Sequence, residues 1–213
     1  MKLALFGATG HIGRAILDEA LARSHEVTAI VRDPARLDAK HPHLRVATGD
    51  AGKPGTWLDA VRGSDAAIAS LSARRDGDNS ALPTNARTLL DHLPEAGVKR
   101  LLWVGGAGSL ETAPGVRVID APDFPVEWKP EAEGQAKALE VFRASTADVD
   151  WTYLSPAALI EDGERNGHYR IGGDQLLVDA NGTSRITVVD YAAALLDRAE
   201  HGDAARQRIT VAY

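Results

Sequence analysis

The chain has 213 residues, 44% of them hydrophobic and 25% charged, which is the balance of an ordinary globular protein. Its 24 Lys and Arg against 30 Asp and Glu give a formal net charge of −6, and the basic doublet Arg74-Arg75 is too short to form a basic face, so we expect no nucleic-acid partner. The absence of cysteine excludes disulfides, thiolate catalysis and cysteine-bound metal sites.

The first segment, MKLALF, is strand-like and has none of the features of a secretory signal. No apolar run reaches the ~20 residues of a membrane-spanning helix. We therefore expect a cytoplasmic protein with no membrane partner, acting as a monomer or homodimer on a small molecule. The histidines show no metal-binding pattern, so we expect no metal site.

Strand-like apolar runs alternate with helical patterns up to residue 155. The predicted strands are 3–6, 27–31, 44–47, 66–71, 101–104 and 151–154, and the predicted helices are 12–23, 55–62, 83–96 and 130–145. Strands separated by helices indicate βαβ units and a mainly parallel sheet. Right-handed crossovers place helices on both faces of such a sheet, so we expect a Rossmann-like, doubly wound α/β fold.

The pattern changes after residue 155. Segments 169–171 and 175–178 flank Gly172-Gly173-Asp174 and predict a hairpin. A short strand is expected at 185–188, a helix capped by Asp190 at 191–200, and a last strand at 208–212. Because this tail is too short to fold alone, we expect a single domain, 1–213, in which 155–213 forms a small lobe on the substrate side of the sheet.

Three glycines at a spacing of three follow the first predicted strand, in the stretch LFGATGHIG. In a dinucleotide-binding fold the first such glycine permits a tight turn, the second lets the pyrophosphate approach, and the third lets helix and strand pack closely. The helix N-terminus then presents N–H groups to the phosphates. The alternative for the loop is a βα turn with incidental glycines. The alternative for His11 is a partly exposed residue in the first turn of the helix that does not contact a phosphate. The candidate cofactor residues here are Gly7, Thr9, Gly10, His11, Ile12 and Gly13.

Arg32 ends the second predicted strand, 19 residues after Gly13. An acidic residue there would bind the ribose 2′-hydroxyl of NAD, whereas a planar guanidinium suits the 2′-phosphate of NADP. Asp33 follows, and the next residue, Pro34, favours Asp33 as the cap of a short helical turn. We therefore expect NADPH as the cofactor, with NADH as the alternative.

The ends of the other strands supply further candidates. Asp50 and Ala51 are expected near the adenine, unless Asp50 only shapes a turn. Ser70, Leu71 and Ser72 are expected near the nicotinamide ribose, unless they are simply a polar strand end. Gly105, Gly106 and Ala107 suggest backbone lying close to a flat ring, with a mobile loop as the alternative.

Five stretches together resemble the atypical short-chain dehydrogenase/reductase superfamily: GATGHIGRAIL, VRDPARL, VKRLLWVGGAGSLE, WTYLSPAALI and RITVVDYAAAL. They look closest to its NAD(P)H-binding branch of NADH-flavin reductase-like proteins, whose relatives include biliverdin reductase B and the NmrA-like regulators. GGAGSLE and the stretch DFPVEWKPEA at 123–132 carry this closer resemblance. It implies an NADPH-binding Rossmann-like domain in which Ser155, Pro156 and Ala157 contact the nicotinamide amide.

The sequence departs from the superfamily at its catalytic tyrosine. The typical site pairs a serine with Tyr-x-x-x-Lys, but no tyrosine lies between the fifth predicted strand and the following long helix. Ser109 matches the serine and is the candidate catalytic and substrate-binding residue, unless it is a loop serine or helix cap. Glu133 stands four residues before Lys137, a spacing that is also that of an ordinary surface pair.

A long connection over 110–130 contains four prolines and is expected to act as a binding loop or lid. Its Phe124 and Trp128 are candidates to stack on a substrate, the alternative being packing beneath the loop.

Three functions follow as hypotheses. Reduction of a ketone needs acid–base help at the oxygen, whereas a flavin or quinone ring needs mainly an oriented hydride donor. Loss of the tyrosine therefore favours an NADPH-dependent reductase of a flavin, quinone or similar conjugated acceptor, with FMN or FAD as substrate rather than prosthetic group. A non-catalytic NADP(H) sensor of the NmrA-like type is the alternative, and an epimerase-like enzyme comes third.

Overall fold

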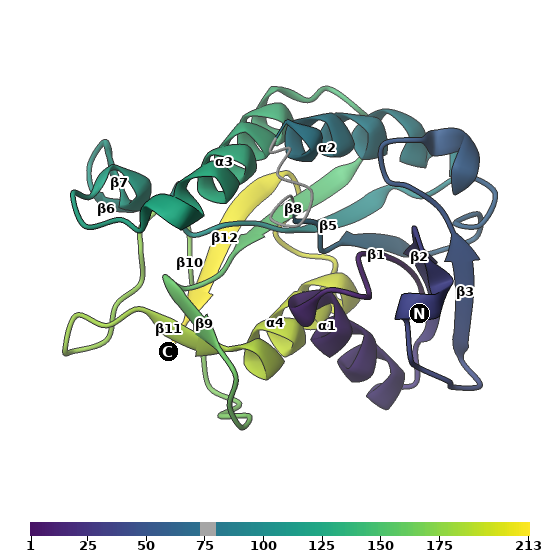
Figure 1. Ribbon diagram of the computed structural model, residues 1–213, viewed down its shortest axis with the longest axis horizontal. Helices are drawn as coiled ribbons and strands as arrows, with labels where there is room; N and C mark the ends of the chain where they lie inside the picture. Colours follow the sequence, from purple (N-terminus) through teal and green to yellow (C-terminus); the bar gives the residue numbers. More distant parts are fainter. Residues whose placement is uncertain (73–79) are drawn as a thin grey trace.

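The computed structural model of the chain describes residues 1–72 and 80–213, so the doublet Arg74-Arg75 lies outside the described residues. Its centre is an eight-stranded sheet in the order β10-β12-β8-β5-β4-β1-β2-β3 (Figure 1). All neighbouring strands are parallel except β10, which pairs with β12 in the antiparallel sense. The chain crosses over after β3 to return beside β1, which is the doubly wound α/β arrangement expected from the sequence. The strands of this sheet are β1 (Lys2–Phe6), β2 (Glu26–Val31), β3 (Leu44–Thr48), β4 (Ala66–Ala69), β5 (Arg100–Val104), β8 (Asp150–Ser155), β10 (Arg170–Gly172) and β12 (Gln207–Ala212).

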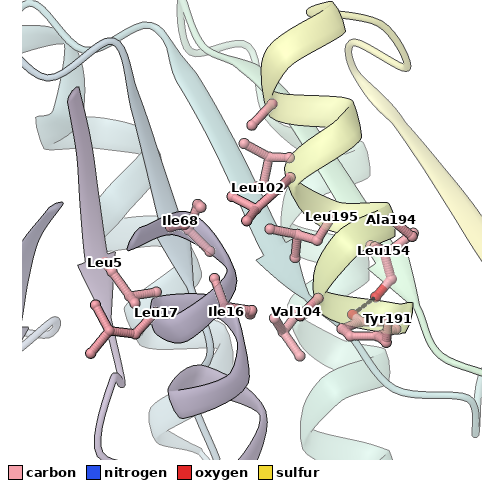
Figure 2. Packing of buried hydrophobic residues seen from close by; sticks show 14 of the residues in the cluster. Leu5, Ile16, Leu17, Ile68, Leu102, Val104, Leu154, Tyr191, Ala194 and Leu195 are labelled. Carbon is pink, nitrogen blue, oxygen red and sulfur yellow. Dashed lines mark hydrogen bonds between the residues drawn. The ribbon is translucent and has the colours of Figure 1, made fainter. Parts of the chain in front are cut away.

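Two pairs of helices cover the two faces of the sheet. Helices α1 (His11–Ala22) and α4 (Val188–His201) pack side by side on one face, and α2 (Ala81–His92) and α3 (Lys129–Ala144) on the other (Figure 1). On the first face, Leu5, Ile68 and Leu102 of the strands meet Ile16 and Leu195 of the helices (Figure 2). These layers confirm the predicted Rossmann-like fold class. No helix in the described part of the chain is long and apolar enough to cross a membrane.

The helix predicted over 55–62 does not form. The structure has a single 3₁₀ turn, Pro54–Thr56, followed by irregular turns as far as Gly63, which has a positive φ of 76°. A segment this short gains little from helix formation, because nucleation costs more than a few backbone bonds return. Burial of Trp57 fixes the segment instead, with its ring packed edge-on against Phe6 at a centroid distance of 5.3 Å.

The predicted hairpin around Gly172-Gly173-Asp174 is also wrong. Strand β10 pairs with β12, while Gln175 makes an isolated bridge to Glu111. The reason lies in the turn residue, because the Asp174 carboxylate binds the guanidinium groups of Arg143 and Arg208. These ion pairs anchor the chain to α3 and β12 after Gly172, and the segment that follows forms no backbone ladder with β10, although the Arg170 side chain donates to the Val178 carbonyl at 2.7 Å.

Short strands outside the main sheet complete the fold. Strand β9 (Leu159–Glu161) pairs in parallel with β11 (Arg185–Thr187), which is the strand expected near 185–188. Strands β6 (Glu111–Ala113) and β7 (Val116–Arg117) form an antiparallel pair within the long connection before α3. The expected single domain with a lobe over 155–213 stays a prediction. Strand β12 and helix α4 come from this region and belong to the main layers.

Asp190 does not cap α4 as predicted. The helix begins at Val188, and the hydroxyl of Thr187 caps it by accepting from the Asp190 N–H. The Asp190 side chain is instead fully buried and accepts hydrogen bonds from the N–H groups of Asn166 and Gly167 and from the Tyr213 hydroxyl, at 2.8, 3.0 and 2.6 Å. Burial raises the pKa of Asp190, but these bonds outweigh that effect and hold its pKa below the usual range.

Replacement of Asp190 by Asn should cost about 2–3 kcal/mol of unfolding free energy at neutral pH, because the amide cannot accept all of these bonds. A lowered folded pKa means that the ionised carboxylate stabilises the protein above about pH 4, and that this contribution is lost as the pH falls through the folded pKa. Urea denaturation across pH 3–7 measures both effects. The difference between wild type and Asp190→Asn should shrink on acidification; a difference that stays constant would contradict the assigned role of the charge.

Candidate functional site

The candidate cofactor residues converge on one edge of the sheet. They follow β1, β2, β3, β4, β5 and β8, which are adjacent parallel strands, and the carboxyl ends of parallel strands meet at the same edge. This edge is where open α/β sheets bind ligands. The structure therefore brings together the loops at 7–13, 32, 50–51, 70–72, 105–109 and 155–157, although they are spread over some 150 residues of sequence.

The three glycines of the first loop have different physical reasons to be glycine. Gly7 has a φ of +85°, and a Cβ there would lie 2.0 Å from the carbonyl oxygen of Ser70. A Cβ on Gly13 would lie 2.1 Å from the carbonyl oxygen of Gly7. Both are thus required by backbone packing. Among residues 1–72 and 80–213, a Cβ on Gly10 would meet only the Gly7 carbonyl oxygen, at 3.4 Å, so these residues leave space in front of Gly10.

That open space faces the N-terminus of α1. Gly10 is the N-cap, no side chain of the described part of the chain caps the helix, and no acidic residue occupies its first turn. Free N–H groups and the positive end of the helix dipole suit a phosphate. The residues present therefore fit a pyrophosphate. His11 points its ring to the carboxylate of Asp162, with Nε2 3.0 Å from the oxygen, and both side chains are mostly exposed.

The residues after β2 and β3 take the expected positions. Arg32 is exposed directly beyond β2. Asp33 accepts from the N–H of Ala35 at 3.0 Å and caps the turn Pro34–Arg36, which confirms that part of the prediction. Asp50 accepts from the N–H of Gly52 at 3.1 Å and so shapes its own turn. Cofactor contacts by Arg32, Asp50 and the buried Ala51 stay predictions.

The glycines after β5 lie against a flat ring of the protein itself. A Cβ on Gly105 would lie 2.1 Å from the ring of Tyr153, a fully buried residue of β8. The Gly106 N–H donates to the Tyr153 hydroxyl at 3.1 Å. Close approach of backbone to an aromatic ring thus explains Gly105, and the expected approach of a nicotinamide to Gly105, Gly106 and Ala107 remains to be tested.

Two buried residues at this edge were missed by sequence reasoning. Gln135 of α3 bonds to Trp103 and to the carbonyl of Leu71, and Tyr153 bonds to the Gln135 carbonyl. The sequence carries a signal for Gln135, because it occupies the apolar stripe that Ala138, Leu139 and Phe142 continue at helical spacing. A polar side chain in such a stripe has to find hydrogen-bond partners in the interior.

Ser109, the candidate catalytic residue, lies in the turn after β5. Its hydroxyl is buried and has no hydrogen-bond partner among the described residues. Its carbonyl accepts from Arg208, at 3.4 Å, and another nitrogen of the same guanidinium lies 3.4 Å from the Ser155 hydroxyl. The Arg208 side chain is only 2% exposed. A charged residue at the start of the predicted strand 208–212, which is otherwise apolar except for Thr210, was the signal for it.

The remaining candidates frame the site. Ser155, Pro156 and Ala157 are buried at the end of β8. Phe124 is half-buried in the connection before α3, and Trp128, the N-cap residue of α3, is 42% exposed. Neither aromatic ring is buried beneath the loop, so both remain candidates to contact a substrate.

All four tyrosine hydroxyls bond within the protein. Tyr153 donates to the Gln135 carbonyl and Tyr191 to the Leu154 carbonyl, the latter contact visible in Figure 2. Tyr169 donates to Asp197 and Tyr213 to Asp190. Burial raises the pKa values of Tyr153 and Tyr191 well above the ordinary value, so both stay protonated. Glu133 and Lys137, at the spacing of the superfamily's Tyr-x-x-x-Lys pair, are both exposed on α3.

A cavity of about 670 Å³ begins at the glycine loop and extends along α1 toward α4. Of the candidate cofactor residues only Thr9, Gly10 and His11 line it. The cavity therefore adjoins the phosphate end of the candidate site and does not lie over the ends of β4, β5 and β8. Among the described residues there is no group of three His, Cys, Asp or Glu side chains that could hold a metal ion.

A sequence profile described as NAD(P)H-binding matches residues 7–199. The chain belongs to this NAD(P)H-binding family. The match begins at Gly7 and ends within α4, so it covers the glycine loop and all of the candidate residues at the sheet edge. A nicotinamide nucleotide is accordingly the cofactor class of the family.

Similar proteins extend over the whole chain. YwnB of Bacillus subtilis (strain 168), a protein described as uncharacterized, is 37% identical over 214 residues, which is 99% of this chain and 98% of YwnB. A candidate epimerase from Bacteroides thetaiotaomicron is 38% identical with a TM-score of 0.90, covering 100% of this chain and 96% of that one. SP1627 of Streptococcus pneumoniae TIGR4, a candidate NADH-flavin reductase, is 36% identical with a TM-score of 0.87, covering 100% and 99%.

Replacement of Gly10 by Val tests the glycine loop of this NAD(P)H-binding protein. The variant should still fold, since among the described residues the new Cβ would contact only the Gly7 carbonyl oxygen. The valine side chain would fill the space before the α1 N-terminus. Binding of NADPH, followed by its fluorescence, should weaken by about 100-fold or more with little change in thermal stability.

Gly13→Ala is the matched control. Its Cβ would lie 2.1 Å from the Gly7 carbonyl oxygen, so it should lower the melting temperature instead. Normal nucleotide binding by folded Gly10→Val would show that the pyrophosphate does not occupy this loop.

Proposed function

We propose that this protein is an NADPH-dependent reductase that delivers hydride to a flavin, a quinone or a similar conjugated acceptor. The observation that carries the proposal is that each of the four tyrosine hydroxyls bonds within the protein, so no tyrosine is offered as a proton donor at the sheet edge. The similar SP1627, named as a candidate NADH-flavin reductase, supports the same class of acceptor.

The choice of NADPH over NADH rests on Arg32. Arg32 is exposed directly beyond β2, where the 2′ position of the adenosine ribose lies in this type of fold, and a guanidinium provides paired donors for a phosphate. The adjacent Asp33 is engaged as a cap, with its carboxylate on the Ala35 N–H, and so competes less for a ribose hydroxyl.

Bound NADPH supplies the hydride; the chain supplies binding and orientation. The α1 N-terminus and Gly10 hold the pyrophosphate, and Gly7 and Gly13 keep strand and helix close enough to form that cradle. Ser70 and Leu71 would border the nicotinamide and its ribose on one side, and Gly105–Ala107 would border the ring on the other. A conjugated ring accepts the hydride into a delocalised system, so solvent can furnish the proton and a dedicated acid is not required.

Two other functions compete with this proposal. A nucleotide-binding regulator of the NmrA-like type would use the same cradle without turnover. An epimerase, the activity named for the similar Bacteroides protein, would oxidise and reduce an alcohol and therefore need acid–base help at its oxygen. The tyrosine hydroxyls, which all bond within the protein, count against that chemistry. The Ser109 hydroxyl is the other candidate for acid–base help at this edge of the sheet.

Substitution of Arg32 by Ala should weaken the binding of NADPH by about 30-fold, equivalent to about 2 kcal/mol of charge-assisted hydrogen bonding. The affinity for NADH should change little. Titration of both nucleotides against both proteins measures the difference. Arg45→Ala, which removes another arginine from the neighbouring strand β3, is the control and should bind both nucleotides as wild type does. Equal losses of NADPH and NADH affinity in Arg32→Ala would overturn the assignment of the 2′-phosphate.

Purified protein should oxidise NADPH in the presence of at least one of FMN, FAD, riboflavin or a simple quinone, measured as loss of nicotinamide absorbance. Gly10→Val prepared in parallel should be inactive, which separates this activity from that of a contaminating reductase. Tight NADPH binding without turnover of any acceptor would favour the regulator and contradict the proposed reductase.

A further inference from the structure

The sheet divides at its carboxyl edge between β4 and β5. Their ladder ends at the pair Ala69–Trp103. Beyond it, the N–H of Ser70 bonds to the carbonyl of Phe6 in β1, at 3.0 Å, and the N–H of Gly105 bonds to the carbonyl of Leu154 in β8, at 2.9 Å. The two chain segments that the proposed function places on either side of the nicotinamide therefore follow different neighbouring strands.

The side chain of Gln135 bridges this division. Its Oε1 accepts from the indole N–H of Trp103 in β5 at 2.9 Å, and its Nε2 donates to the carbonyl of Leu71 beyond β4 at 3.1 Å. An indole nitrogen can only donate and a carbonyl can only accept, so the chemistry of the partners fixes the orientation of the amide. No other orientation of the Gln135 amide satisfies both partners.

Tyr153 ties the same residue to the other side of the division. Its hydroxyl donates to the main-chain carbonyl of Gln135 at 3.0 Å and accepts from the N–H of Gly106 at 3.1 Å. Again the roles are fixed, because the carbonyl only accepts and the N–H only donates. The ring of Tyr153 lies against Gly105, where a Cβ would come within 2.1 Å of it.

These bonds form a network that meets at Gln135. Its main-chain carbonyl accepts from Tyr153, which accepts from Gly106, and its side-chain amide bonds to Leu71 and Trp103. Gln135 is 5% exposed and Tyr153 fully buried, so the middle of the network is shielded from solvent, whereas Leu71 and Gly106 at its ends are half-buried. Such a network holds a single geometry, because loss of one member leaves another buried group unpaired.

We propose that Gln135 and Tyr153 are positioning residues, which set the distance between Leu71 and Gly106 and thereby the orientation of the nicotinamide between them. They would act through Leu71 and Gly106, to which their hydrogen bonds run, and not by contact with the ring. The proposal rests on the proposed function for the placement of the nicotinamide, but not for the network. The pyrophosphate and adenosine positions lie beyond β1, β2 and β3, and the network does not contact them.

Tyr153→Phe and Gln135→Met each remove one link while keeping the size of the buried side chain. Both should bind NADPH within about threefold of wild type, because the phosphate and adenosine contacts remain. Turnover of the acceptor should fall by at least about tenfold, since misplacement of a reacting group by a fraction of an ångström to an ångström is costly. Tyr169→Phe, which loses a hydroxyl bonded to Asp197 on α4, is the matched control and should keep wild-type turnover.

Transferred nuclear Overhauser effects between the nicotinamide and ribose protons of NADP⁺ report the ring orientation without turnover. Wild type and Tyr169→Phe should show one orientation, and the two network variants a mixture. This readout stands even if wild type reduces no acceptor, an outcome that would refute the proposed function alone. Unchanged orientation and turnover in both variants would overturn the positioning role, as would parallel losses of NADPH binding, melting temperature and turnover.

Gln135→Glu adds a pH test. An ionised carboxylate accepts from Trp103 but has no donor for Leu71, whereas a protonated carboxyl reproduces both bonds of the amide. Burial favours the protonated form, so turnover relative to wild type should recover as the pH falls from about 8 to about 6. A ratio that does not change with pH while the protein stays folded would contradict a role for the donor to Leu71.

Discussion

The close approach of the β1–α1 turn to its neighbours is the constraint on which the rest of the structure depends. A side-chain carbon at Gly7 would lie 2.0 Å from the Ser70 carbonyl oxygen, and one at Gly13 would lie 2.1 Å from the Gly7 carbonyl oxygen. Backbone atoms cannot move aside as the end of a flexible side chain can. Strand β1, helix α1 and the end of β4 are therefore locked together, and the free N–H groups of α1 point over the sheet edge beside Gly10.

At the other half of the edge a glycine again permits close approach, here of the backbone to an aromatic ring. Gly105 lets the backbone lie against the ring of Tyr153, and hydrogen bonds through Gln135 connect that region back to Leu71. One half of the edge thus has an uncapped helix end that suits a phosphate, and the other has a buried network that suits a fixed ring. In a nicotinamide dinucleotide the pyrophosphate joins the two nucleosides at the middle of the molecule and the nicotinamide lies at one end, so a single bound molecule would occupy both halves of the edge.

Sequence reasoning recovered what is encoded locally. The glycine turn after β1, most of the strand-helix alternation and the Asp33-Pro34 turn each depend on a few adjacent residues and have the predicted form, whereas the helix predicted over 55–62 does not form. The errors concern contacts between distant residues. Trp57 is held by Phe6, Asp174 by Arg143 and Arg208, and Asp190 by residues 166, 167 and 213, so propensity gave way to tertiary contacts in each case. Tyr153 looked like any core aromatic, because its hydroxyl partners lie 18 and 47 residues away.

Transfer of hydride from the C4 position of NADPH is the central claim, and stereospecifically deuterated NADPH tests it most directly. Single-turnover oxidation of bound NADPH by a flavin or quinone should slow when deuterium occupies one of the two C4 positions and stay unchanged when it occupies the other. A protein that fixes the nicotinamide between Leu71 and Gly106 presents only one of its faces. Equal slowing by deuterium at either C4 position would contradict the fixed orientation, and equal rates for all three forms of NADPH, with oxidation shown to be limited by chemistry, would contradict hydride transfer itself.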